Sequence, residues 1–178
     1  MRISYTRTHK EAVPMKTSNA AERMPRPVAA AELHGSHLAP GIRGLVRFYP
    51  AHSGTMVSIV VSGLPELRLS KDPKNRVGPF AFHIHEGDVC GSPRPPEPFR
   101  AAGGHYNPKN RPHPLHAGDL PTVYPNRGYA NMTVYTDRFR PDEVIGRTAM
   151  LHIRPDDYHS QPAGNAGERI ACGVIRAV

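Results

Sequence analysis

Short runs of β-type residues, separated by turn residues, recur through most of this 178-residue chain. Apolar and polar side chains tend to alternate in each run, as they do in a strand with one buried face. Gly, Pro, Asn and Asp separate the runs, and no segment has a convincing helical period. The runs are GIRGLVRFYP, GTMVSIVVSGL, GPFAFHIH, YANMTVYTD, EVIGRTAMLHI and ERIACGVIRAV, beginning at residues 41, 54, 78, 129, 143 and 168. The pattern predicts an all-β fold, an antiparallel sandwich or barrel.

The chain divides into a basic N-terminal segment and one predicted domain. Residues 1–28 contain six Lys or Arg against two Glu, few large apolar residues and no period of 2 or 3.6. We interpret this segment as a flexible tail that carries +4 of the formal net charge of +8. Residues 29–178 form the predicted domain, because this length supports one core but is short for two.

Charge and hydropathy limit the partners that we expect. No apolar run approaches the ~20 residues of a membrane-spanning helix, so no membrane partner is expected. Lys and Arg are scattered without a dense basic run, which argues against nucleic-acid binding despite the net positive charge. A secretory leader needs an apolar stretch of roughly 7–15 residues. None is visible in residues 1–28.

The run FHIHEGDVC places two histidines two positions apart in an otherwise apolar strand. His83 and His85 would share one strand face, while Phe82 and Ile84 would share the other. Two imidazoles on one face can bind a common ion, because neutral imidazole is a common ligand of copper and zinc. A face exposed to water is the alternative, since alternating polar residues on antiparallel strands usually contact solvent.

Two long segments rich in turn residues interrupt the strands. Residues 86–118 are rich in Pro, Gly and His, and residues 154–167 read RPDDYHSQPAGNAG. Loops of this length without secondary structure are usually functional or disordered. Histidine is concentrated in the first segment, which therefore becomes the main candidate for a functional loop.

Histidines supply two candidate sets of metal ligands. One set lies within fifteen residues and consists of His105, His113, His116 and Asp119. Three imidazoles and one carboxylate suit tetrahedral zinc. The other set consists of His83, His85 and His152. These three nitrogens suit a tetragonal copper site if His105 or a water molecule adds another ligand.

Five segments of the chain, taken in order, resemble the signature segments of the copper/zinc superoxide dismutases. They are FHIHEGDVC, AAGGHYNP, HAGDLP, VIGRTAMLHIRPDD and GNAGERIACGVI. The resemblance spans roughly residues 29–176, and HAGDLP and the early cysteine are more similar to the bacterial branch. It implies an eight-stranded antiparallel Greek-key sandwich or barrel with two long functional loops, and an oxidoreductase with Cu and Zn as cofactors.

The resemblance also implies a role for each matching residue. The implied copper ligands are His83, His85, His105 and His152, and the implied zinc ligands are His105, His113, His116 and Asp119. His105 would thus bridge the two metals as an imidazolate. Asp156 matches a carboxylate that accepts hydrogen bonds from ligand histidines of both sites. Arg169 matches an arginine beside copper that attracts and orients a small anion. His105 and Arg169 are the expected catalytic residues.

The implied activity is the conversion of superoxide to dioxygen and hydrogen peroxide by redox cycling of copper, with zinc in a structural role. The bridge at His105 would open on the copper side, take up a proton and donate it to the departing peroxide. The alternative is a non-catalytic protein that stores or delivers copper and zinc on the same scaffold, since a fold alone does not determine activity. The joint presence of four copper ligands and Arg169 favours the enzyme.

The same resemblance pairs the two cysteines, Cys90 and Cys172. Their disulfide would anchor the metal-binding loop to the last strand, and two buried free thiols are the alternative. A disulfide suits an exported protein, whereas the lack of a visible leader suits the reducing cytoplasm. The sequence therefore leaves the compartment open. It also leaves the oligomeric state open, with a homodimer as one candidate.

The segment between His113 and His116 departs from the family pattern. Only Pro114 and Leu115 lie between them, where relatives usually carry a longer, glycine-rich connection. Because Pro114 restricts the backbone of His113, we expect a less ideal zinc geometry and weaker zinc binding.

Two further departures concern the loops. Pro162 and Ala163 stand where animal enzymes of the family have a lysine and a threonine at the rim of the substrate channel. We therefore expect this loop to steer the anionic substrate more weakly. A proline-rich insert, GSPRPPEPFR, follows Cys90. We interpret this insert as a stiff surface spacer.

Overall fold

The computed structural model describes residues 25–178. Most of the predicted tail lies outside these residues, so the boundary between tail and domain at residue 28 stays a prediction. The described elements are β1 (Ala29–Gly35), β2 (Arg43–Ala51), β3 (Gly54–Ser62), η1 (Pro73–Asn75), β4 (Phe80–His85), η2 (Arg100–Ala102), β5 (Asp119–Val123), β6 (Ala130–Thr136), η3 (Pro141–Val144), β7 (Thr148–His152), β8 (Arg169–Val174) and β9 (Arg176–Ala177). Within this part of the chain, no helix has the length and apolar character needed to cross a membrane.

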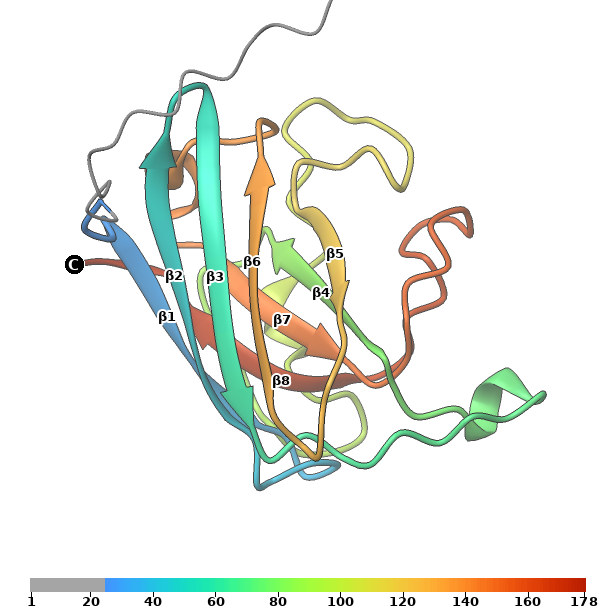
Figure 1. Ribbon diagram of the computed structural model, residues 1–178. Coiled ribbons are helices and arrows are strands. Elements are labelled where there is room, and N and C mark those ends of the chain that lie inside the picture. The colour runs from blue at the N-terminus through green and yellow to red at the C-terminus, as the bar shows by residue number, and fades with distance from the viewer. Residues whose placement is uncertain (1–24) are drawn as a thin grey trace, which may run out of the picture.

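The strands form one antiparallel sheet that curves into a nearly closed barrel (Figure 1). Eight strands follow the order β5-β4-β7-β8-β1-β2-β3-β6, and the short β9 pairs with β1. The connections from β3 to β4 and from β6 to β7 join strands that are not neighbours, as in a Greek key. The all-β, eight-stranded antiparallel expectation is confirmed.

The hydrophobic core fills the inside of the barrel with alternate residues of the strands. In β2, Val46 and Phe48 are fully buried, and in the paired β3, Val57 and Ile59 are buried as well. These residues occupy every second position, which is why the polar and apolar alternation of the sequence predicts both strands. Burial of each large side chain stabilises the fold by about 1.5–3 kcal/mol.

Two strands were not expected from the sequence, and one expected run is shorter than predicted. β1 is rich in alanine, a residue of low β propensity, and β5 contains Pro121, which is tolerated because β5 lies at an end of the strand order. The run that begins at residue 143 is a strand only from Thr148. Its first residues belong to η3, where Pro141 favours a helical turn over a strand.

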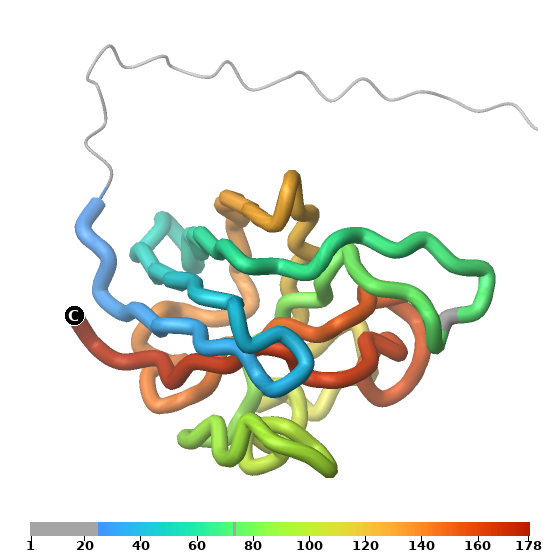
Figure 2. The backbone as a smooth tube through the Cα atoms, turned by 90° about the horizontal axis from the view of Figure 1, so that it is seen from below, coloured from blue at the N-terminus to red at the C-terminus, as the bar shows by residue number. Residues whose placement is uncertain are grey.

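β4 is buried along its whole length because both of its faces are covered. Phe82 and Ile84 lie in the barrel core. His83 and His85 point to the outer side and are only 0% and 1% exposed. Figure 2 shows the yellow-green segment after β4 and the red segment between β7 and β8 outside the ring of strands. The prediction of one apolar and one histidine face is correct, and the alternative of a water-exposed face is wrong.

A disulfide links Cys90, in the segment after β4, to Cys172 in β8. Cys172 is 2% exposed, and its side chain lies outside the barrel core in a small cluster with Phe99, Ala102 and Met150. The structure thus contains the bond rather than two free thiols. The bond ties the first long loop to the strand that begins at Arg169.

Replacement of both cysteines, Cys90→Ala with Cys172→Ala, should lower the free energy of unfolding. The bond spans 82 residues, and its constraint on the unfolded chain corresponds to at most about 4–5 kcal/mol. Chemical denaturation of the metal-free protein measures the difference, and wild type under reducing conditions should match the variant. A loss below about 1 kcal/mol would contradict this dependence on the bond.

Candidate metal centre

Two clusters of buried side chains could each hold a metal ion. Within each cluster, one ligand atom per residue lies within 4.8 Å of those of the other members. The first cluster is His83, His85, His105 and His152, and the second is His105, His113, His116 and Asp119. His105 belongs to both clusters. The structure therefore brings together all seven side chains that the sequence analysis proposes as ligands.

Neighbouring strands position the first cluster. β4 supplies His83 and His85, and β7, which pairs with β4, ends at His152. His105 joins them through a backbone bridge with His85. The ring centroids of His83 and His105 are 4.0 Å apart, and those of His83 and His152 are 5.1 Å apart. Because β4 and β7 pair, the imidazoles on the outer face of these strands lie close together although they are distant in sequence.

Nitrogen atoms that face into the clusters lack hydrogen-bond partners. His83 Nδ1, His105 Nε2 and His113 Nδ1 are buried and have no partner among the described residues. An unpaired buried polar atom costs about 1–3 kcal/mol. The Nε2 atoms of His85 and His152 also converge, at 3.2 Å. These converging imidazole nitrogens fit the donor set that copper and zinc accept.

The opposite nitrogens of two rings are hydrogen-bonded to backbone carbonyls. His85 Nδ1 lies 3.0 Å from the carbonyl oxygen of Gly103, and His152 Nδ1 lies 3.0 Å from that of Gly167. Because a carbonyl oxygen can only accept, each Nδ1 carries the hydrogen and each Nε2 presents a lone pair. These hydrogen bonds select the tautomers and fix the rings in the orientation that a shared metal ion requires.

Asp156 connects the two clusters. Its Oδ2 lies 2.8 Å from His83 Nε2, and its Oδ1 lies 2.9 Å from His113 Nε2. The carboxylate thereby holds the hydrogens on the two Nε2 atoms and leaves both Nδ1 atoms free for a metal ion. Gly164 packs directly against it, with φ of +64°, and a Cβ there would overlap with the carboxylate.

The second cluster is compact around Asp119. Asp119 Oδ1 lies 2.7 Å from His105 Nδ1 and 3.3 Å from His116 Nδ1. Its Oδ2 lies 3.1 Å from His113 Nδ1. One carboxylate is therefore within reach of all three imidazoles, which is the donor set that suits zinc.

Two residues that the sequence analysis missed hold the short connection between His113 and His116. Arg138 Nη1 donates to the carbonyl oxygens of Pro114 and His116, at 2.8 and 3.1 Å. The Gln161 side chain accepts from the backbone N–H of His113 at 3.1 Å and donates to its carbonyl at 2.6 Å. These contacts fix the backbone of the short connection, and both histidines reach the cluster. No local motif identifies such contacts between distant residues.

Burial favours the neutral, metal-binding form of His83, His85 and His152. Burial lowers the pKa of His152 to about 3, although the hydrogen bond to Gly167 opposes the shift. Burial also lowers the pKa values of His83 and His85 well below 6.5, with further lowering by neighbouring imidazoles. Burial alone would raise the pKa of Asp119, but the hydrogen bond and charge of His105 outweigh it and lower the pKa. Asp119 is therefore a carboxylate.

Arg169 lies beside the first cluster, because it pairs with His152 across β7 and β8. Its Nη1 donates to the carbonyl oxygen of Phe99 at 2.7 Å, and its Nη2 donates to that of Gly103 at 2.6 Å. The Gly103 carbonyl also binds His85. A guanidinium held in this way can attract and orient a small anion.

Comparison with known proteins agrees with this geometry. The family described as Copper/zinc superoxide dismutase (SODC) matches residues 42–175. The chain belongs to the copper/zinc superoxide dismutase family. The Cu-Zn superoxide dismutase of Deinococcus radiodurans is 37% identical over 77% of this chain and 79% of the relative. Cu-Zn superoxide dismutase 2 of Aquifex aeolicus is 36% identical over 75% of this chain and 78% of the relative. The expected family and its enzyme class, an oxidoreductase, are confirmed.

Solved structures share the fold of this family member. A superoxide dismutase-like protein from Bacillus subtilis has a TM-score of 0.64 and 25% identity, covering 81% of this chain and 95% of its own. A double mutant of a superoxide dismutase-like protein from the same organism, with a tyrosine and a proline replaced by histidine, has a TM-score of 0.64 and 26% identity. It covers 81% of this chain and 94% of its own.

An open cavity of about 510 Å³ is lined by His152. Pro162 and Ala163 line it too, and so does Arg154. Arg154 also lines a second cavity, of about 290 Å³, together with Arg169. The sequence analysis did not single out Arg154. Its position is the signal: Arg154 lies two residues beyond His152, the last residue of β7, and is therefore close to the first cluster.

The metal-free protein should lose stability as the pH falls from 7 to 5.5. In this range an unfolded histidine, with a pKa near 6.5, takes up a proton, whereas His152 stays neutral when folded because its pKa is about 3. The unfolded state binds more protons, so His152 alone lowers the free energy of unfolding by about 1 kcal/mol over this range.

Urea denaturation at several pH values measures this dependence. The pKa values of buried His83 and His85 are shifted in the same direction and should steepen it. A His152→Gln variant, which cannot titrate at this position, should have a shallower slope than wild type. A free energy of unfolding that stays constant or rises as the pH falls would contradict the prediction.

Proposed function

We propose that this protein is a superoxide dismutase that converts two superoxide ions and two protons to dioxygen and hydrogen peroxide. The observation that carries the proposal is a pair of buried ligand clusters that share His105, with an anchored Arg169 beside the first. Membership of the family and the names of several relatives support the same activity. Superoxide is the proposed small-molecule substrate.

The proposed ligand sets follow from the donor atoms. Copper would be held by His83, His85, His105 and His152, and zinc by His105, His113, His116 and Asp119. Four imidazole nitrogens suit copper, whereas three with a carboxylate suit zinc. When bound, copper supplies the one-electron reduction and oxidation that the reaction needs, and zinc supplies a fixed charge that orders the loop around His113.

His105 is the proposed proton donor. Its Nδ1 lies against the Asp119 carboxylate at 2.7 Å, while its buried Nε2 faces the first cluster without a partner. We propose that Nε2 holds a proton in one half of the cycle and gives it to the reduced product in the other. Asp156 keeps His83 and His113 oriented on either side during this exchange.

Arg169 and Arg154 are the proposed guides for the anion. Burial lowers the pKa of Arg169 and nearby Glu97 raises it. The guanidinium nevertheless remains charged, as in proteins generally. Arg154 adds a second positive charge in the cavity beside His152. It stands near Pro162 and Ala163, so we propose that it supplies part of the attraction that a lysine at that rim would provide.

A non-catalytic copper- and zinc-binding protein, for storage or delivery, is the second candidate function. The Bacillus subtilis neighbours are described as superoxide dismutase-like and not as superoxide dismutases, which supports this second candidate. Arg169 argues against it, because its guanidinium is fixed by two carbonyl groups beside the first cluster, where it would serve an approaching anion and would have no use in metal storage. The two candidates differ in turnover, and metal binding is common to both.

Metal analysis should identify two sites of different composition. Wild type should bind one equivalent each of copper and zinc; His152→Ala should lose copper and keep zinc, whereas His113→Ala should lose mainly zinc. An exposed histidine, in His52→Ala, provides the control. Retention of copper by His152→Ala would contradict the assignment of the first cluster.

Direct observation of superoxide decay separates the enzyme from the storage protein. His152→Ala should abolish turnover, and Arg169→Ala should slow it by roughly tenfold or more and weaken its dependence on salt. Arg176→Ala removes the same charge from an exposed strand and should have a much smaller effect. Metal-loaded wild type without turnover would favour storage or delivery.

A further inference from the structure

Phe99 adopts a backbone conformation that phenylalanine rarely takes. It lies near the end of the proline-rich insert, immediately before η2, with φ of 57° and ψ of 28°. This left-handed region is unfavourable for residues that carry a Cβ. Such conformations persist only where the surroundings impose them, and they gather at functional sites.

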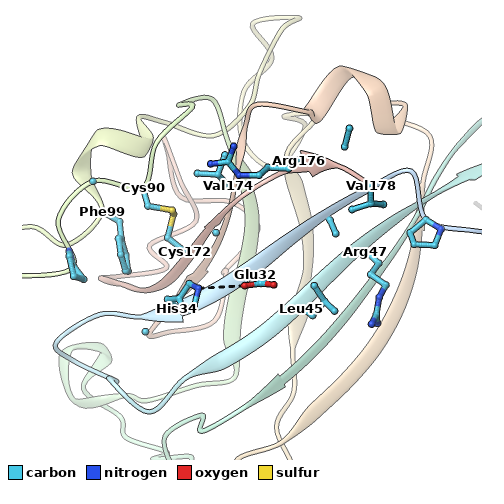
Figure 3. A pocket seen from close by; sticks show the side chains of 17 residues that line it. Glu32, His34, Leu45, Arg47, Cys90, Phe99, Cys172, Val174, Arg176 and Val178 are labelled. Atoms are coloured by element: carbon cyan, nitrogen blue, oxygen red, sulfur yellow. Dashed lines mark ion pairs between the residues drawn. A yellow bond between two sulfur atoms is a disulfide. The ribbon is translucent and has the colours of Figure 1, made fainter.

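The aromatic ring of Phe99 accounts for this conformation. The residue is 4% exposed, and its ring packs with Ala102, Met150 and Cys172, with Cys90 against them. Figure 3 shows the Phe99 side chain close to the Cys90–Cys172 disulfide, among the residues that line a cavity of about 900 Å³. Burial of a ring of this size offsets the cost of the left-handed backbone. The contact partners lie on β7, β8 and the first loop, so the ring ties the insert to two strands.

The backbone of Phe99 transmits this anchoring to Arg169. The Phe99 N–H donates to the Ser92 carbonyl at 2.7 Å and closes the insert into a loop. Its carbonyl oxygen accepts from Arg169 Nη1 at 2.7 Å and from the Ala102 N–H at 3.1 Å. The turn then reaches Gly103, whose carbonyl accepts from Arg169 Nη2 at 2.6 Å. Ring, turn and guanidinium form one continuous series of contacts.

We propose that Phe99 is a positioning residue, whose buried ring fixes the turn that orients the Arg169 guanidinium toward the anion. The inference rests on the proposed function, because it assigns Phe99 a role in the same site. The proposal also gives the insert GSPRPPEPFR a role beyond that of a spacer. The loop that this insert forms is closed between Ser92 and Phe99, and Phe99 is its buried anchor.

Two variants that each remove one buried phenyl ring separate positioning from general stability. Phe99→Ala removes the ring beside Arg169. Phe139→Ala removes a ring of the barrel core that packs against Phe48 at a centroid distance of 6.4 Å. Both should lower the melting temperature. Only Phe99→Ala should loosen the hydrogen bonds that orient the Arg169 guanidinium.

The first readout does not require metal. In the metal-free protein labelled with ¹⁵N-arginine, the hydrogen-bonded Nη groups of Arg169 should give resolved signals, assigned by their loss in Arg169→Lys. These signals should persist in Phe139→Ala and broaden or vanish in Phe99→Ala. Wild-type signals in folded Phe99→Ala would overturn the proposal.

The second readout is the affinity of the copper- and zinc-loaded protein for azide, a small anion, followed by its charge-transfer absorption. Phe99→Ala should bind azide roughly fivefold to tenfold more weakly. Phe139→Ala should bind it like wild type, and Phe99→Leu, which restores an apolar anchor, should return to within about twofold. Equal affinity in wild type and Phe99→Ala would also overturn the proposal.

A further variant keeps the test decisive if Phe99→Ala does not fold. Phe99→Gly accepts the left-handed backbone without steric strain and removes the ring. It should fold with weakened Arg169 signals, and wild-type signals would overturn the proposal. If metal-loaded wild type lacks turnover, the proposed function fails, but the Arg169 signals still decide the role of Phe99.

Discussion

The buried carboxylate of Asp156 is the contact on which the site depends. It accepts from His83 on β4 and from His113 in the first long loop, and it lies itself at the start of the second. Three segments of the chain are thus joined by one side chain that is not exposed to water. Loss of this group would leave two buried imidazole nitrogens unpaired, at about 1–3 kcal/mol each. Both clusters would lose orientation together.

Fold and site occupy opposite sides of the same strands. Phe82 and Ile84 pack in the barrel core. His83 and His85 lie on the outer face and belong to the first cluster, where loops cover them and exclude solvent. The core can therefore compensate for unpaired nitrogens in the site, because burial of one large apolar side chain offsets about one such atom. This separation explains how a rigid barrel tolerates a cluster of groups that destabilise the metal-free chain.

Residue type and local period predicted an all-β antiparallel fold and two candidate sets of ligands, whereas the resemblance to the family supplied the strand number, the Greek-key topology and the place of His105 in both clusters. β2 and β3 alternate regularly, whereas β1 is rich in alanine and β5 includes Pro121, so neither has a local strand pattern. The candidate ligands were found because imidazole and carboxylate groups have a distinctive metal-binding chemistry. Arg138, Gln161 and Phe99 were not, since they act through backbone groups of distant residues: Gln161 and His113 are 48 positions apart. Tertiary contacts of this kind leave no periodic signal in the sequence.

The carbonyl oxygen of Gly103 accepts a hydrogen from His85 and another from Arg169. An imidazole of one cluster and the neighbouring guanidinium are therefore joined through a single carbonyl oxygen, whose two lone pairs accept one hydrogen bond from each. A tilt of the His85 ring, whether from a larger ion or from a substitution nearby, would reach the Arg169 guanidinium through this oxygen. Under the proposed function, selectivity for the metal and capture of the anion would therefore be coupled through this one oxygen atom.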